Sequence, residues 1–267
     1  MFTQYFSLKF NPFTKETGEK DVFLSNDSKE LLSRLGYLKQ TRGFFLLTAN
    51  AGFGKTTVLR KFASTLNHGL FSPFYTALSS LTAMDFYRSL IIKMGDAPAF
   101  RKAAMFEQLQ RLISASYHEK RVTPVFILDE AQALSGSVLE GLPMIFSFKM
   151  DSENPFIAIV SGNINIRRKL QLSPCQAMRQ RFVGNYHMAG LLRDEVEPYI
   201  SSRLALAGAP DKNIFSPAAL ESIFASSGGA LRVVNNLAVA SLACACSRNL
   251  SLVDEEVVYQ AGKDIEI

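Results

Sequence analysis

The sequence has few of the residues that build metal sites or disulfide frameworks. It contains three cysteines and three histidines among 267 residues. Cys175, Cys244 and Cys246 lack the spacing of zinc ligands, and an odd number of cysteines does not make a disulfide framework. We therefore expect buried, reduced thiols and no structural zinc site.

Long apolar runs are also absent. No stretch of roughly 18 uncharged apolar residues occurs, and residues 237–247, LAVASLACACS, are too short to span a bilayer. The first residues, MFTQYFSLKFNPF, lack the basic flank and the continuous apolar stretch of a signal peptide. There is no internal repeat and no low-complexity segment. These absences predict a soluble, cytoplasmic protein that has no membrane segment.

The charge balance is only mildly basic. The formal net charge is +5, and the pI is about 9.1. This excess favours an anionic partner such as nucleic acid, although a solvated, lysine-rich surface is the more ordinary explanation. With 48% hydrophobic and 20% charged residues, the composition is that of a globular chain.

Five short apolar runs alternate with helical patterns. We expect strands at residues 44–48, 73–78, 125–129, 156–160 and 185–188, and helices between them at residues 57–66, 84–94, 105–117 and 137–149. Two of the runs, 125–129 up to its final Asp129 and the whole of 156–160, are continuously apolar, as are parallel strands that are covered on both faces. The alternation predicts an α/β fold in which a parallel sheet has helices on both faces.

The pattern changes after about residue 190 and becomes helical. Ser216 precedes Pro217 at the start of one helix, and Asp254 precedes the acidic first turn of the last one; both are typical N-caps. We predict a nucleotide-binding α/β core over residues 1–190, with an N-terminal segment at 1–40, and a small helical lid domain over residues 191–267.

A segment of small residues lies between the first strand and its helix. Residues 49–56, ANAGFGKT, align on the lysine with the phosphate-loop pattern G-x-x-x-x-G-K-[ST]. Glycines in such a loop let backbone N–H groups approach phosphate oxygens, the lysine reaches the β- and γ-phosphates, and the hydroxyl after it binds Mg²⁺. The alternative is a glycine-rich turn with a chance lysine. The predicted nucleotide-binding residues are Ala49, Asn50, Ala51, Gly52, Phe53, Gly54, Lys55, Thr56 and Thr57.

An acidic pair ends the strand expected at 125–129. Ligands of open α/β sheets bind at the carboxyl ends of strands, where Asp129 and Glu130 follow four apolar residues. Asp129, together with Thr56, would hold Mg²⁺ partly through water, and Glu130 would orient and activate the attacking water. The alternative is a strand that simply leads into a helix with acids in its first turn.

Further polar and cationic candidates follow. Asn163, after the next strand, is a candidate to position the attacking water, or else a turn residue that starts a helix. Charge that develops on a transferred phosphoryl group needs cations, which Arg179, Arg181 and Arg232 could supply. The alternative for these arginines is an ordinary place on the solvated surface.

On these motifs the chain resembles the AAA+ ATPases of the ExeA/GspA type and the related transposition helper ATPases of the IstB, TniB and MuB kind. The resemblance covers nearly the whole chain, and its most specific parts are YFSLKFNPF, VFILDEAQAL and GGALRVVNNLA. It implies a P-loop NTPase fold, the cofactors ATP and Mg²⁺, and a homo-oligomeric ring or helical filament. It also implies that Asn163 is sensor 1, that Arg232 is sensor 2, and that Arg179 or Arg181 is an arginine finger acting on a neighbouring subunit. The N-terminal segment would wall the adenine.

The chain departs from the pattern of these families in several places. Relatives usually have glycine at position 49, a small residue at position 53, and glutamine-proline where this chain has Asn163-Ile164. The ring of Phe53 could point to solvent or to a partner. Pro143 falls inside a helix that relatives leave unbroken, and it predicts a kink or a late helix start. These changes are expected to affect the rate of hydrolysis more than nucleotide binding.

Three functions remain open for such an ATPase. The first is a transposition helper that binds duplex DNA when loaded with ATP and recruits a transposase or an integrase-like protein. The basic helix start at residues 165–170 would serve it, unless it is only an exposed helix end. The second is a secretion-system ATPase, whose relatives carry a membrane helix and a cell-wall-binding domain after the ATPase; their absence here favours DNA binding. The third is a nucleotide-dependent scaffold with little hydrolysis.

Overall fold

The computed structural model describes residues 2–14, 18, 21–77, 81–209 and 213–265. The chain divides into two compact units. The sheet unit comprises residues 30–49 and 55–188, and the helical unit comprises residues 1–29, 50–54 and 189–267. The domain division at residue 190 stays a prediction; by internal contacts, the N-terminal residues and the segment 50–54 belong with the C-terminal helices.

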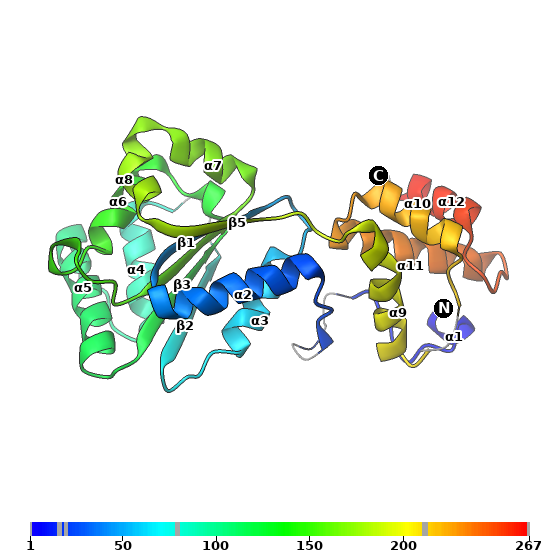
Figure 1. The fold of residues 1–267 in the computed structure, drawn as a ribbon, viewed down its shortest axis with the longest axis horizontal. Coiled ribbons are helices and arrows are strands. Elements are labelled where there is room, and N and C mark those ends of the chain that lie inside the picture. Colours follow the sequence, from blue (N-terminus) through cyan, green and yellow to red (C-terminus); the bar gives the residue numbers. More distant parts are fainter. Residues whose placement is uncertain (1, 15–17, 19–20, 78–80, 210–212, 266–267) are drawn as a thin grey trace. The chain divides into compact units, whose positions relative to one another are not determined.

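A five-stranded parallel sheet forms the centre of the sheet unit (Figure 1). Its strands are β1 (Gly43–Ala49), β2 (Phe71–Ala77), β3 (Thr123–Asp129), β4 (Ile157–Gly162) and β5 (Phe182–Met188), in the order β2-β3-β4-β1-β5. Every neighbouring pair is parallel, which confirms the predicted fold class. Each predicted strand overlaps an observed one. Leu78, which ends the predicted strand 73–78, lies outside the described residues.

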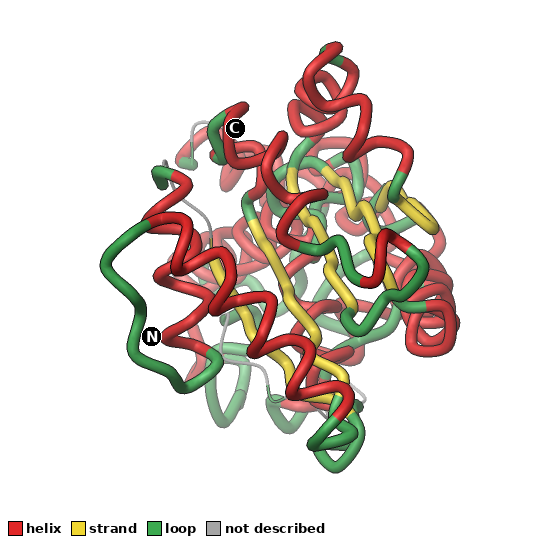
Figure 2. The backbone as a smooth tube through the Cα atoms, turned by 90° about the vertical axis from the view of Figure 1, so that its left-hand side faces the viewer, coloured by secondary structure: helices red, strands yellow, loops and turns green. Residues whose placement is uncertain are grey.

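Helices cover both faces of this sheet (Figures 1 and 2). On one face, alternate strand residues such as Phe44 and Phe126 form a buried core with α4 (Ala83–Lys93), α5 (Lys102–His118), α6 (Gly136–Ile145), α7 (Ile164–Gln171) and α8 (Gln176–Gln180). The intervening residues, among them Phe45 and Ile127, are buried on the other face with α2 (Asn26–Thr41) and α3 (Lys55–Ser64). Burial on both faces is why β1, β3 and β4 are nearly continuous apolar runs in the sequence, whereas the edge strands β2 and β5 are only partly buried.

The strand order brings the carboxyl ends of β3, β4 and β1 together, because these strands are consecutive neighbours. Asp129 ends β3, Gly162 ends β4 and Ala49 ends β1. Parallel strands bind ligands at their carboxyl ends. The segments that carry the predicted phosphate-binding and acidic residues therefore meet at one edge of the sheet.

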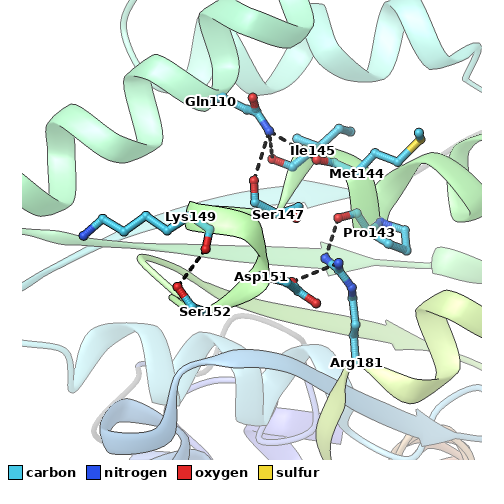
Figure 3. A network of polar contacts seen from close by, with 9 residues as sticks. All are labelled: Gln110, Pro143, Met144, Ile145, Ser147, Lys149, Asp151, Ser152 and Arg181. Carbon is cyan, nitrogen blue, oxygen red and sulfur yellow. Dashed lines mark hydrogen bonds and ion pairs between the residues drawn. The ribbon is translucent and has the colours of Figure 1, made fainter.

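The helix α6 differs from the helix predicted at residues 137–149. It begins at Gly136, contains Pro143 and ends at Ile145, so the late start predicted from the proline does not occur. Proline lacks an N–H and crowds the preceding turn, and α6 ends within one turn of it. Gln110 of α5 donates its side-chain amide to the carbonyls of residues 144, 145 and 147, which satisfies groups that the helix leaves unpaired (Figure 3).

The helical unit has a core of its own. It contains α1 (Phe2–Tyr5), α9 (Val196–Leu206), α10 (Pro217–Ser227), α11 (Leu231–Ser247) and α12 (Glu255–Asp264). The predicted N-caps are confirmed, since Ser216 Oγ accepts the N–H of Ala219 and Asp254 Oδ1 accepts that of Val257. Phenylalanines of the N-terminal segment pack against this core, and their place beside adenine stays a prediction.

The described residues also form short 3-10 turns at Ala131–Ala133 (η2), Lys149–Asp151 (η3), Ser173–Cys175 (η4) and Arg193–Glu195 (η5). The turn η2 directly follows β3 and the acidic pair. Within the described ranges, every helix is too short or too polar to cross a membrane.

Candidate nucleotide-binding site

The predicted phosphate loop joins β1 to α3. The strand ends at Ala49, which is buried, and the helix begins at Lys55. Gly52 and Gly54 have φ values of +84° and +92°, a left-handed backbone that residues with a Cβ rarely adopt. A buried strand, two left-handed glycines and a helix N-terminus are the parts of an anion-binding loop.

Lys55 and Thr56 open α3 in the sheet unit. The side chain of Lys55 is buried, and its Nζ donates to the carbonyl of Ala49 at 3.3 Å. A buried ammonium group is costly unless acceptors or anions lie near it. Thr56 is exposed, and its Oγ1 donates to Asp129 Oδ2 at 2.7 Å. Folding therefore brings the two predicted Mg²⁺ ligands side by side.

Asp129 is buried and accepts four hydrogen bonds. Besides the bond from Thr56, its Oδ2 accepts one from Tyr75 Oη at 3.3 Å. Its Oδ1 accepts from Ser161 Oγ at 2.8 Å and from the N–H of Glu130 at 3.0 Å. Burial, and then the charges of Asp129 and Glu130, raise the pKa of the Tyr75 hydroxyl, so that it stays a neutral donor. Four donors compensate for the removal of this carboxylate from water.

Glu130 follows in a left-handed backbone conformation, with φ 58° and ψ 35°. This conformation is strained for a residue with a side chain, and such strain clusters at functional sites. The exposed carboxylate accepts a hydrogen bond through Oε2 from Nε2 of Gln132 at 2.5 Å. Oε1 of Gln132 in turn accepts the backbone N–H of Asn163 at 3.0 Å. One amide thus links Glu130 to the end of the neighbouring strand.

Asn163 is the N-cap of α7. Its Oδ1 accepts the N–H of Asn165 at 2.9 Å, as the turn interpretation of this residue expected. The cap uses the side-chain oxygen and not the amide nitrogen, which is the group that would donate to a water or a phosphate. A capping role and a role beside the nucleotide are therefore compatible, and sensor 1 stays a prediction.

The two candidate arginine fingers have different surroundings. Arg181 donates to the carbonyl of Pro143 at 2.5 Å and pairs with Asp151 at 2.9 Å (Figure 3). Asp151 ends η3, whose three residues all have positive φ. Arg181 thus holds the end of α6 to this turn. Arg179, on α8, is exposed, and no ion pair among the described residues involves it.

In the helical unit, the loop segment 50–54 meets the start of α11. The N–H of Arg232 donates to the carbonyl of Gly52 at 3.1 Å, and the Arg232 side chain is exposed. Phe53 is half-buried, and a Cβ added at Gly190 would lie 2.4 Å from its ring. The ring therefore packs against a glycine of its own chain while it stays partly exposed, and its contact with solvent or a partner stays a prediction.

Most of the basic residues at the start of α7 bind groups within the sheet unit. Arg167 Nε donates to Thr48 Oγ1 at 3.2 Å. Lys169 Nζ donates to the carbonyls of Gln132 and Leu134 at 2.6 and 2.8 Å. Arg168 is exposed. Two of the three cations in the predicted DNA-binding stretch therefore bind groups of the protein itself.

Three side chains at this edge were not predicted from the sequence, namely Tyr75, Gln132 and Ser161. Tyr75 and Ser161 stand near the carboxyl ends of β2 and β4, where any polar residue of a parallel sheet is a candidate. The two-sided contact of Gln132 depends on β3 and β4 being neighbours, which residue spacing alone does not show.

The residues of the loop and of the acidic strand end fit a nucleoside triphosphate with a divalent cation. A hydroxyl and a carboxylate oxygen 2.7 Å apart are the hard oxygen ligands that Mg²⁺ prefers. A buried lysine and left-handed glycines before a helix suit the phosphates. Lys55, Thr56 and Asp129 are the residues that would hold the group.

Comparison with known proteins defines the class. Residues 38–170 match a protein family described as AAA domain. Together with the five parallel strands, their order and the loop between β1 and α3, the match shows an AAA+ P-loop NTPase fold, followed by C-terminal helices.

A relative found by sequence points to a more specific type within the AAA+ class. General secretion pathway protein A of Aeromonas hydrophila is 29% identical over a match of 257 residues, and the match covers 93% of this chain. The chain spans 45% of the length of that protein. The two matches support an AAA+ protein that is similar to the ExeA/GspA type, which is the resemblance that the motifs indicated.

Solved structures of Cdc6p, ORC1 and RuvB proteins share the fold. Cdc6p of Pyrobaculum aerophilum has a TM-score of 0.68 at 14% identity, covering 95% of this chain and 70% of its own. ORC1 of Aeropyrum pernix, solved in complex with DNA, has a TM-score of 0.67 at 17% identity, with coverages of 96% and 69%. The RuvB Holliday junction branch migration motor of Thermotoga maritima has a TM-score of 0.58 at 20% identity, with coverages of 90% and 72%.

Proposed function

We propose that this protein binds ATP together with Mg²⁺ and hydrolyses it to ADP and phosphate. The observation that carries the proposal is the cluster at the carboxyl edge of the sheet, where Thr56 and Asp129 are in hydrogen-bond contact and Glu130 directly follows. Two separate segments, the start of α3 and the end of β3, supply these groups, and each has the chemistry that a P-loop NTPase requires at that place.

Each residue has a distinct role in this proposal. Lys55 and the glycine loop bind the triphosphate, and Thr56 and Asp129 hold the cation. Mg²⁺, when bound, neutralises phosphate charge. Glu130 accepts a proton from the attacking water, for which an exposed carboxylate beside the site is suited. The amide of Asn163 orients that water from the end of β4.

The arginines complete the proposal. We assign the finger to Arg179, because it is exposed whereas Arg181 is bound to Pro143 and Asp151 of its own chain. A finger that acts on a neighbour requires a homo-oligomer, a ring or a filament, in which Arg179 of one subunit stabilises charge at the site of the next. Arg232, at the start of α11 beside Gly52, remains the candidate for sensor 2.

Paired measurements of binding and turnover test the proposal. Lys55→Ala is expected to abolish ATP binding in titration calorimetry, whereas Lys93→Ala, an exposed lysine at the end of α4, should bind like wild type. Glu130→Gln should bind ATP and lose turnover, because only the proton acceptor changes. Equal affinity in Lys55→Ala and wild type would refute the phosphate-loop assignment, and full turnover in Glu130→Gln would remove that residue from its role.

The relative found by sequence favours a role for this protein in a secretion pathway. That relative is a secretion pathway protein and matches 93% of this chain. We propose that the ATPase serves as the nucleotide-dependent part of such an assembly. ATP turnover by a stable homo-oligomer without added DNA would support this role, and turnover that strictly requires duplex DNA would contradict it.

The DNA-binding alternative rests on net charge and on the DNA complex of one structural neighbour. The transposition role, with a transposase or integrase-like partner, stays a prediction. Filter binding of duplex DNA across a salt series, with and without ATP, separates the alternatives. Retention that depends on ATP and falls steeply with salt would favour DNA binding, and no retention at low salt would exclude it.

A further inference from the structure

Gln132 is held by contacts on both sides of its side-chain amide. Its Nε2 donates to the carboxylate of Glu130, and its Oε1 accepts the backbone N–H of Asn163. The N–H can only donate and the carboxylate can only accept, so the amide has a single orientation that satisfies both. The contacts themselves therefore fix which end of the amide faces Glu130.

Neighbouring residues on β4 and α7 favour this position of Gln132. A Cβ added at Gly162 would lie 2.6 Å from Gln132 Oε1, so a larger residue at the end of β4 would displace the amide from its present position. On the backbone side, Lys169 Nζ donates to the carbonyls of Gln132 and Leu134, which anchors the turn η2 to α7. Two other elements thus support one glutamine.

We infer that Gln132 is a positioning residue that orients the Glu130 carboxylate and couples it to Asn163. Glu130 is exposed, and its side chain would otherwise sample several rotamers. Its hydrogen bond to Gln132 restricts the carboxylate to one direction, and the second bond ties that direction to the N-terminus of α7. The inference rests on the proposed ATPase function of this same site.

Two substitutions separate the two contacts. Gln132→Glu keeps the length and an oxygen that can accept the Asn163 N–H, but it replaces the donor toward Glu130 with a like charge. Gln132→Met removes both contacts at similar length. Both variants are expected to lower kcat about 10- to 100-fold, because small misplacements of a reacting group have effects of this size. The Kd for ATP should stay within about twofold, since Gln132 is not among the phosphate-binding residues.

A double-mutant cycle distinguishes positioning from a structural role. If Gln132 acts through Glu130, then Gln132→Met should not lower the residual turnover of Glu130→Gln any further. Gln110→Met is the matched control, because it also removes amide bonds to the backbone, here at the end of α6 (Figure 3). That variant should lose stability but keep the kcat of the folded protein.

Different experimental results would contradict the proposed ATPase function and the inference about Gln132. Wild-type protein without any turnover would contradict the ATPase function and the inference together. An active wild type, a Glu130→Gln variant with only residual turnover and unchanged kcat in both Gln132 variants would overturn the inference alone. A further loss in the double variant equal to that of Gln132→Met alone would also overturn it, because Gln132 would then act independently of Glu130.

Discussion

Replacement of Arg181 by methionine is expected to destabilise the sheet unit. The guanidinium binds two segments at once, the carbonyl of Pro143 near the end of α6 and the carboxylate of Asp151 in η3 (Figure 3). Methionine keeps an unbranched side chain of similar length but has no donor and no charge. The substitution therefore removes the polar contacts and largely preserves the packing.

The two contacts contribute unequally. A hydrogen bond from a charged donor to a carbonyl stabilises by about 1.5 to 3 kcal/mol. The ion pair contributes only about 0 to 1 kcal/mol, because the Asp151 side chain is 53% exposed and solvent screens it. We expect Arg181→Met to lower the free energy of unfolding by about 2 kcal/mol, and Asp151→Asn to lower it by less than about 1 kcal/mol.

Arg179→Met is the matched comparison. Arg179 is exposed, so its loss should change the free energy of unfolding by less than about 0.5 kcal/mol. ATP turnover by the Arg179→Met variant should nevertheless fall on the order of 10³-fold, which is the size of effect seen when an arginine finger is lost.

Urea unfolding followed by circular dichroism, together with steady-state ATP turnover, measures both effects on the same preparations. The assignment predicts that stability falls in Arg181→Met and turnover falls in Arg179→Met. The reverse result would refute it: wild-type stability with lost turnover in Arg181→Met, and normal turnover in Arg179→Met, would make Arg181 the finger.

Other substitutions test further parts of the account. Gly36, inside α2, has nothing within 4 Å of an added Cβ, so Gly36→Ala should stabilise by about 0.5 to 1 kcal/mol in urea unfolding; destabilisation would mean that the helix is packed differently. The chain has no tryptophan, so Phe53→Trp adds a single fluorescent reporter. Its emission should be blue-shifted, because packing against Gly190 removes part of the indole ring from water. Emission like that of free tryptophan would contradict that contact. Burial raises the pKa of the Tyr199 hydroxyl above 10. The unfolded chain then releases this proton first, so stability should fall as the pH rises above about 10, and Tyr199→Phe should reduce the fall; an equal fall in that variant would contradict the assignment.

The strands and the phosphate loop were predictable from the sequence because their signals are local. Continuous apolar runs mark strands that are buried on both faces, and the glycines and Lys55 have a fixed spacing between a strand and a helix. Helix caps such as Ser216 are local in the same way, and the structure has them where they were expected.

Features that depend on the neighbours of a segment were not predictable. The contact between Gln132 and Asn163 requires β3 and β4 to be adjacent, and the packing of Phe53 requires Gly190, which is more than a hundred residues away. The sequence left the alternatives for Arg179 and Arg181 equal. Only the folded chain shows that Arg181 is bound to Pro143 and Asp151.

The most direct test of the central claim is a crystal structure with Mg²⁺ and a non-hydrolysable ATP analogue. The account predicts that the triphosphate is bound by residues 52–56, that the cation is beside Thr56 and Asp129, and that Gln132 still contacts Glu130. An edge of the sheet without nucleotide at saturating analogue, or a nucleotide bound away from Lys55, would contradict it.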